Sequence, residues 1–115
     1  MASKKVKSKK GWIYVISNPA MHGYVKIGRT GKHPYDRIRD MQTGAPLPYQ
    51  MEFMVEVKDM YEAEARLHTC FRKDFDLDGY GEWYQYGCST FETKDDLVGV
   101  IESEVNSILK WQGAV

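Results

Sequence analysis

Two runs rich in β-branched and aromatic residues lie close together near the start of the chain, GWIYVIS at 11–17 and GYVKIGR at 23–29. The first run ends in Ser17-Asn18-Pro19, a combination that marks a turn. Two such runs on either side of a short turn predict an antiparallel β-hairpin. We therefore expect the fold to start from a sheet on which the later elements pack.

The next segment predicts a short helix followed by a third strand. Pro34 suits the first turn of a helix, and Ile38 and Met41 lie three residues apart on one side of it. Thr43-Gly44 and the prolines beyond it end this helix. The segment MEFMVEV at 51–57 then places apolar residues at every second position, as a half-buried strand does.

The second half of the chain predicts two further helices with a strand between them. Asp59 and Glu62 form a capping pair for a helix whose apolar stripe continues to about residue 73. EWYQY at 82–86 is a candidate strand, and Thr93 with Asp96 can cap a last helix at 94–111. The inner face of that helix consists of Leu97, Ile101, Val105, Ile108 and Leu109. The order β-β-α-β-α-β-α predicts an α+β fold.

Length and composition favour a single domain at 11–115, preceded by a disordered basic tail at 1–10. The 115 residues, 43% of them hydrophobic, suffice for one modest core. No run reaches the roughly 18 apolar residues of a membrane helix, and the lysine-rich start lacks the apolar segment of a signal peptide. We therefore expect a cytoplasmic protein with no membrane partner. Cys70 and Cys88 are too few for a disulfide framework or a zinc site, and we assign them no chemistry.

The formal net charge is zero, but the charges are unevenly distributed. Residues 1–50 carry ten Lys or Arg against two Asp, whereas residues 51–115 carry six Lys or Arg against fourteen acids. A basic first half attracts phosphate backbones by counterion release. A solvated tail accounts for the terminal lysines equally well. Charge alone therefore does not assign a nucleic-acid partner.

The run DFDLDG at 74–79 resembles the opening of a calcium-binding loop. Acids stand at the first, third and fifth positions, and a glycine stands at the sixth, where the tight turn is needed. The twelfth position, however, is Gln85 instead of the bidentate glutamate. A solvated acidic turn is therefore favoured over specific calcium binding.

One set of residues around the hairpin suits phosphoryl chemistry. If register and pleat parity allow it, Tyr14 and Lys26 point to one face of the hairpin, and Arg37 follows on the next helix. The two cations can stabilise charge on phosphate oxygens, and a nearby cation lowers the pKa of a phenol towards use as a base. Glu64 on the second helix can supply the missing carboxylate as a ligand for Mg²⁺.

Five fragments, taken in order, resemble the GIY-YIG nuclease superfamily, in the phage and bacterial branch whose second motif reads KIG instead of YIG. They are WIYVIS, YVKIGRT, YDRIRDMQTGAPLP, EARLH and GEWY, and they span about residues 11–86. Each fragment alone is weak, but their order and spacing are specific. The resemblance implies a small mixed sheet with flanking helices, and hydrolysis of DNA phosphodiester bonds that depends on Mg²⁺ or Mn²⁺.

The resemblance also implies roles for four catalytic residues. Tyr14 matches the tyrosine of the GIY motif, the general base or its helper. Lys26 stands where the YIG tyrosine usually lies, which leaves the path of the proton open. Arg37 matches the helix arginine that grips the scissile phosphate, and Glu64 matches the metal-binding glutamate.

Four further residues are nucleic-acid-binding candidates: Arg29, Lys32, Arg39 and His68. Arg29 either contacts phosphate or is a turn residue in solvent. His68 lies four residues after Glu64 on the same helical face, where it orients the carboxylate, contacts substrate or has a purely structural role. Lys26 is either a functional group or a lysine that extends from a strand edge.

Nuclease modules of this superfamily usually borrow specificity from a separate DNA-binding domain, and 115 residues leave no room for one. We therefore expect a DNA-binding partner protein or a homodimer, which would suit a double-strand cut. The last helix, 94–111, lies outside the matched motifs, and its inner face either completes the core or forms a dimer interface.

Two other functions fit the same sequence. The first is a DNA-associated adaptor that keeps the fold without catalysis, which Lys26 and the acidic second half permit. The second is a calcium- or protein-binding domain centred on the acidic turn at 74–79. The presence of all four polar positions favours the endonuclease, acting in the cytoplasm of a bacterial or phage-infected cell.

Overall fold

The expected hairpin forms the centre of the structure. β1 (Gly11–Ser17) pairs antiparallel with β2 (Tyr24–Thr30), and the turn between them contains a short 3-10 helix, η1 (Pro19–Met21). Asn18 caps that helix, because its side chain accepts a hydrogen bond from the Ala20 N–H. This computed structural model describes residues 9–74, 79–80, 82–88 and 90–113.

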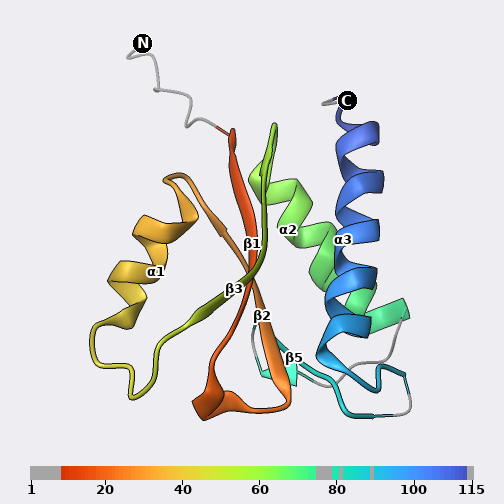
Figure 1. The fold of residues 1–115 in the computed structure, drawn as a ribbon. Coiled ribbons are helices and arrows are strands. Elements are labelled where there is room, and N and C mark those ends of the chain that lie inside the picture. Colours follow the sequence, from red (N-terminus) through yellow and green to blue (C-terminus); the bar gives the residue numbers. More distant parts are fainter. Residues whose placement is uncertain (1–8, 75–78, 81, 89, 114–115) are drawn as a thin grey trace.

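Further strands add to both edges of the hairpin, which gives the sheet order β3-β1-β2-β5-β4 (Figure 1). β3 (Gln50–Val57) pairs with β1, β5 (Trp83–Gln85) pairs with β2, and β4 (Gly79–Tyr80) pairs with β5. The α+β class is confirmed, but every pairing among the described residues is antiparallel, whereas a mixed sheet was expected. The two-residue β4 was not predicted, because it is too short to show an alternating pattern.

The helix between β2 and β3 explains why β3 runs antiparallel to β1. β2 ends at Thr30, which lies opposite Trp12 at the start of β1. α1 (Pro34–Gln42) then carries the chain back along the sheet, so that β3 starts opposite Ser17 at the far end of β1. As predicted, Pro34 occupies the first turn of α1.

α2 (Met60–Thr69) and α3 (Lys94–Trp111) lie across the sheet from α1 (Figure 1). Both begin at their predicted caps, since Asp59 accepts from the Glu62 N–H and Thr93 forms a capping box with Asp96. α2 continues into one π-helical turn, η2 (Cys70–Asp74), in agreement with the helix end predicted near residue 73. In the described part of the chain, no helix combines the length and the hydropathy needed to cross a membrane.

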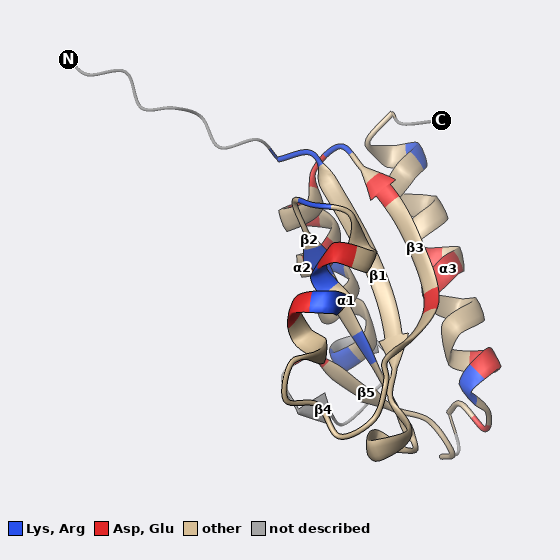
Figure 2. Ribbon diagram, turned by 60° about the vertical axis from the view of Figure 1, so that its left-hand side comes forward, with Lys and Arg blue, Asp and Glu red and all other residues tan. Residues whose placement is uncertain are grey.

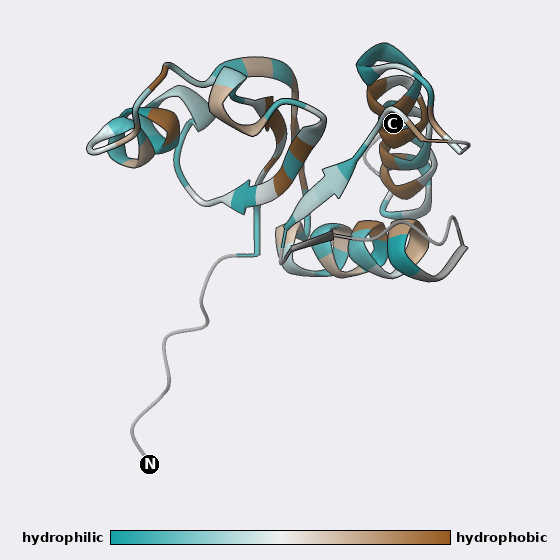
Figure 3. Cartoon of the chain, turned by 90° about the horizontal axis from the view of Figure 1, so that it is seen from below, coloured by the Kyte–Doolittle hydropathy of each residue, from teal (hydrophilic) through white to brown (hydrophobic). Residues whose placement is uncertain are grey.

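The hydrophobic core lies between the sheet and the pair α2 and α3. Ile13, Val15, Val25 and Ile27 of the hairpin are fully buried on this side. The inner face of α3 is buried against them, at Leu97, Ile101, Val105, Ile108 and Leu109. Figure 3 shows the apolar residues of α3 as a stripe beside hydrophilic ones. Of the two readings of this face, the structure therefore supports completion of the core.

Both ends of the described chain are tied to the start of α2. The Met60 N–H donates to the Lys9 carbonyl at 2.8 Å, and the Asp59 N–H donates to Gln112 Oε1 at 3.2 Å. The Gln112 amide in turn donates to the Asp59 carbonyl at 3.1 Å. One corner of the molecule thus holds the beginning and the end of the domain.

Three sequence-based assignments concern segments away from the sheet. Cys70 and Cys88 are half-buried residues packed against the core, and they form no disulfide among the described residues. Residues 1–8 of the predicted tail lie outside the described residues. So do residues 75–78 of the acidic turn, so its calcium-binding reading stays a prediction.

Candidate active site

Tyr14 and Lys26 point to the same face of the hairpin, the face that α1 covers. Tyr14 lies opposite Gly28 and Ile16 lies opposite Lys26 in the register of β1 and β2. Residues that are opposite, or two apart along a strand, share a face, so the predicted condition on register is met. Met41 of α1 contacts both side chains, with its Sδ 3.9 Å from the Tyr14 hydroxyl and 3.5 Å from the Lys26 ammonium.

Gly28 is a site residue that the sequence analysis missed. A Cβ at this position would lie 2.4 Å from Cζ and from the hydroxyl oxygen of Tyr14. The tyrosine ring can therefore lie across β2 only because residue 28 has no side chain. A glycine inside a strand-like run was the available signal, since it often marks a close approach of another group.

Arg37 of α1 lies near the Tyr14 hydroxyl but does not determine its acidity. Burial raises the pKa of Tyr14 above the ordinary tyrosine value, and the Arg37 guanidinium opposes this rise without cancelling it. The nearby cation thus lowers the pKa of this phenol as expected, but desolvation outweighs the charge, so the net shift of the pKa is upward. Tyr14 is a protonated phenol at neutral pH and can donate a hydrogen bond.

Glu64 extends from α2 and is nearly inaccessible to solvent. Arg29 of β2 donates to its Oε1, and the same guanidinium lies 4.6 Å from the centre of the Tyr61 ring. Burial works against the charge of Glu64, but the facing His68 ring in its protonated form and the paired Arg29 lower its pKa below the ordinary value. Glu64 is thus an ionised carboxylate with one oxygen paired.

His68 contacts both Glu64 and the core. Its Nδ1 is hydrogen-bonded to the Tyr84 hydroxyl, and the two rings stack with centroids 5.5 Å apart. Its Nε2 lies 3.7 Å from Oε2 of Glu64, which is too long for a hydrogen bond. Burial raises the pKa of Tyr84 to about 12, so its hydroxyl stays protonated. Tyr84 therefore fixes the orientation of the imidazole.

Glu82, just before β5, connects the two halves of the site. Its carboxylate lies 3.4 Å from the Lys26 ammonium. Ligand atoms of Glu64, His68 and Glu82 all lie within 4.8 Å of one another. The structure thus brings the hairpin residues and the α2 residues together around Glu82. Glu82 belongs to the fragment GEWY, but no role was predicted for it from the sequence.

Lys32 and Arg39 pair with acids on an exposed surface. Lys32 pairs with Asp40, and the guanidinium of Arg39 lies 3.3 Å from Asp36. The hydrogen bond from Lys32 lowers the pKa of Asp40, so that carboxyl is ionised. Figure 2 shows the resulting alternation of basic and acidic positions along α1. The exposed surface of α1 is therefore balanced in charge and not a basic patch.

The donor atoms around Glu64 fit a divalent cation. Glu64 Oε2 and His68 Nε2 are buried, and neither has a hydrogen-bond partner among the described residues. A carboxylate oxygen and an imidazole nitrogen are both common metal ligands. The observation that these two atoms face each other unpaired satisfies the chemical requirement for a metal site.

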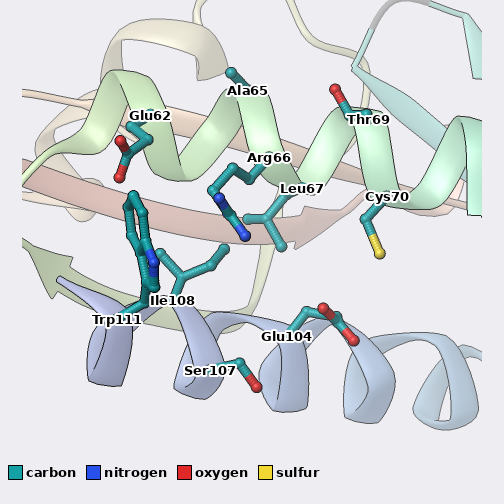
Figure 4. Close-up of a pocket in the computed structure, with 10 residues that line it drawn as sticks. All are labelled: Glu62, Ala65, Arg66, Leu67, Thr69, Cys70, Glu104, Ser107, Ile108 and Trp111. Atoms are coloured by element: carbon teal, nitrogen blue, oxygen red, sulfur yellow. The ribbon is translucent and has the colours of Figure 1, made fainter.

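A cavity lies elsewhere, in a groove between α2 and α3 (Figure 4). It has a volume of about 590 Å³, and its lining includes Glu62, Arg66, Glu104 and Trp111. Glu62 and Arg66 come from the flank of α2 that faces α3, and the other two come from α3 itself. Glu64 and His68 come from the flank of α2 that faces β2. The groove contains neither the hairpin residues Tyr14 and Lys26 nor Glu64, so we assign the site by its donor atoms and not by cavity size.

Comparison with known proteins assigns the chain to a family. A family model described as the T5orf172 domain matches residues 11–111, which is nearly the whole chain. No curated protein matches the sequence, and no solved structure matches it either. The matched range runs from the first residue of β1 to the last residue of α3 and includes every residue of the site described above. The chain therefore belongs to the T5orf172 domain family.

Proposed function

We propose that this domain is a metal-dependent endonuclease that hydrolyses DNA phosphodiester bonds with Mg²⁺ or Mn²⁺. The observation that carries the proposal is a set of linked contacts. Arg37 lies near the Tyr14 hydroxyl, and Met41 contacts both Tyr14 and Lys26. Glu82 pairs with Lys26 and has a ligand atom within 4.8 Å of one in Glu64. T5orf172 domains occur in phage and bacterial proteins that are often linked to nucleases. The resemblance of the same residues to GIY-YIG motifs supports the reaction class.

The charged residues have distinct roles in the proposed mechanism. A metal ion held by Glu64 would act as a Lewis acid on the scissile phosphate. The Arg37 guanidinium suits a phosphate oxygen, because its fork of donors matches the phosphate geometry. The Lys26 ammonium stabilises the negative charge that develops during in-line attack by water.

Tyr14 acts in this mechanism through its hydroxyl proton. Because burial keeps the phenol protonated at neutral pH, it is suited to orient the attacking water or a phosphate oxygen by hydrogen bonding. Use of Tyr14 as a base requires that it first lose this proton. We therefore expect Tyr14→Phe to slow cleavage without changing its pH dependence across the neutral range.

We further propose that affinity for DNA depends on a second DNA-binding module or on a second copy of the chain. The charge balance on α1 supports this, since Lys32 and Arg39 are each paired with an aspartate. Arg29 is paired with Glu64 in the same way. A domain whose surface cations are neutralised gains little affinity from counterion release.

The test is cleavage of supercoiled, nicked and branched DNA by the purified protein, with Mg²⁺ or with EDTA. We expect metal-dependent nicking that is lost in Glu64→Gln and in Arg37→Ala. The matched controls are Glu102→Gln on the exposed side of α3 and Arg66→Ala in the groove between α2 and α3, which should both cut normally. Binding of DNA without cleavage of any substrate would replace the nuclease by the adaptor.

A further inference from the structure

Two buried polar atoms face one another without partners beside the proposed active site. Glu64 is only 5% exposed, and its Oε2 lies 3.7 Å from Nε2 of His68. Both atoms lack a hydrogen-bond partner in the part of the chain that the structure describes. Buried polar groups are normally paired. A third atom that binds both would satisfy them together.

The other end of each side chain is already held. Arg29 pairs with Oε1 of Glu64, and the Tyr84 hydroxyl is hydrogen-bonded to Nδ1 of His68. When Nδ1–H donates to the tyrosine oxygen, Nε2 presents its lone pair to the site, which is how metal-bound histidines are usually supported. The two unpaired atoms are therefore oriented before any ligand arrives.

Glu82 supplies a third ligand atom within reach. Ligand atoms of Glu64, His68 and Glu82 lie within 4.8 Å of one another, whereas bonds of about 2.1 Å to one ion need separations of about 3–4 Å. The Glu82 side chain is 45% exposed. Its ion pair with Lys26 keeps it at the edge of the site.

The charges of the cluster cancel one another before any ion binds. Glu64 and Glu82 carry two negative charges, and Arg29 and Lys26 carry two positive charges. With a neutral imidazole the cluster has no net charge, and a bound divalent ion would give it two positive charges. Such a cluster attracts a negatively charged phosphodiester only when the divalent ion is bound.

We propose that Glu64, His68 and Glu82 form one three-residue site for a divalent transition-metal ion, which binds there more tightly than Mg²⁺. The catalytic use of the ion rests on the proposed function, and the new elements are two further ligands and the class of ion. Mg²⁺ prefers oxygen ligands and retains its waters, whereas imidazole nitrogen favours transition metals. The role assigned to His68 is therefore metal coordination and not DNA contact.

The test uses Mn²⁺ as a probe, without DNA. Electron spin echo spectroscopy of the Mn²⁺-loaded full chain should detect one directly bound nitrogen, and calorimetry should give an affinity for Mn²⁺ at least tenfold above that for Mg²⁺. His68→Ala should abolish the nitrogen signal and the preference for Mn²⁺. Absence of the nitrogen signal in the wild-type protein, or its persistence in His68→Ala, overturns the proposal.

Two controls separate coordination from folding. His22→Ala removes a histidine in the turn after η1 and should leave both the nitrogen signal and the Mn²⁺ affinity unchanged. Tyr84→Phe keeps the imidazole but removes the group that orients it, and should weaken Mn²⁺ binding about tenfold. If His68→Ala does not fold, the wild-type spectrum and Tyr84→Phe decide the question. Unchanged affinity in Tyr84→Phe would contradict the arrangement.

The outcome is independent of the cleavage assay. A nitrogen-bound ion in a protein that cuts no DNA would sustain this site while removing the proposed function. Cleavage by a wild-type protein whose Mn²⁺ shows no nitrogen ligand would sustain the proposed function while removing this site. The two proposals therefore fail separately.

Discussion

Tyr14 occupies its position because Gly28 leaves space for it on the neighbouring strand. In Gly28→Ala the added methyl group would lie where the phenol ring lies, so either the ring or the strand has to move. We expect the free energy of unfolding to fall by about 1–3 kcal/mol, as is typical for overpacking. Urea denaturation followed by circular dichroism measures this loss.

Gly99→Ala in α3 is the matched control, because a Cβ there meets nothing within 4 Å. Helix propensity predicts that this change raises the free energy of unfolding by up to about 1 kcal/mol. Combining Gly28→Ala with Tyr14→Ala removes the clash, so the pair should cost less than the sum of the single variants. Strict additivity would argue against the steric explanation.

Tyr84 makes stability depend on pH in the alkaline range. Its pKa in the folded state is about 12, whereas tyrosine in an unfolded chain titrates near 10. The folded state holds the proton more tightly, so its contribution is complete below about pH 10 and is lost as the pH rises towards about 12. We expect a loss of about 2 kcal/mol between about pH 9 and pH 11.5, measured by denaturant unfolding.

Tyr84→Phe should flatten this pH dependence. The substitution will not remove the pH dependence entirely, because burial also raises the pKa of Tyr14. Tyr35→Phe is the control, since Tyr35 is 53% exposed and contributes no buried phenol. If the free energy of unfolding of Tyr84→Phe falls with pH as steeply as that of the wild type, groups other than Tyr84 cause the pH dependence.

At the level of elements, α3 depends on a cap that lies far from the site. Thr93 accepts from the Asp96 N–H at 3.1 Å, and the Asp96 carboxylate accepts from the Thr93 N–H at 3.2 Å. Thr93→Ala should lower the free energy of unfolding by about 1 kcal/mol, measured by thermal denaturation. Ser103→Ala, in the middle of the same helix, removes a hydroxyl without affecting a cap. A loss as large in Ser103→Ala would show that the cap is not the cause.

The same helix shows which elements can be predicted from sequence. Its bounds, 94–111, agree with the structure because a capping box and an apolar stripe coincide in the sequence. The hairpin was predicted for a similar reason, since composition and turn residues agree. The two-residue β4 could not be predicted, because a periodic pattern needs several residues.

The contacts within the site were less predictable than its members. The expectation that Tyr14, Lys26, Arg37 and Glu64 form one site came from the order of the motifs, and their catalytic roles stay a prediction. That Arg29 pairs with Glu64, and Lys26 with Glu82, depends on where α2 and the segment before β5 lie relative to β2. No local sequence pattern encodes these positions, because they result from packing across the sheet. The same holds for the balance between burial and charge that sets the pKa of Tyr14.

In the molecule as a whole, α2 separates two different surfaces. One flank presents Glu64 and His68 towards β2, and the other forms the groove with α3, where the Arg66 guanidinium lies 4.8 Å from the Trp111 ring. Residues three and four apart on a helix share a flank. The residues that face β2 and the residues that face α3 therefore alternate along α2. Substitutions in the groove should therefore leave the metal-binding cluster intact, as the cleavage control Arg66→Ala assumes.

The meeting of Lys9 and Gln112 at the start of α2 means that the chain can be reconnected. A short linker from Gly113 to Lys9, with new ends opened between Thr43 and Gly44 in the exposed loop after α1, gives a circular permutant that should fold to the same structure. Its circular dichroism and melting curve, compared with those of the parent, measure this, and an unfolded permutant would contradict it. Because the two ends of the described chain lie close together, the domain can also be inserted into a loop of a host protein.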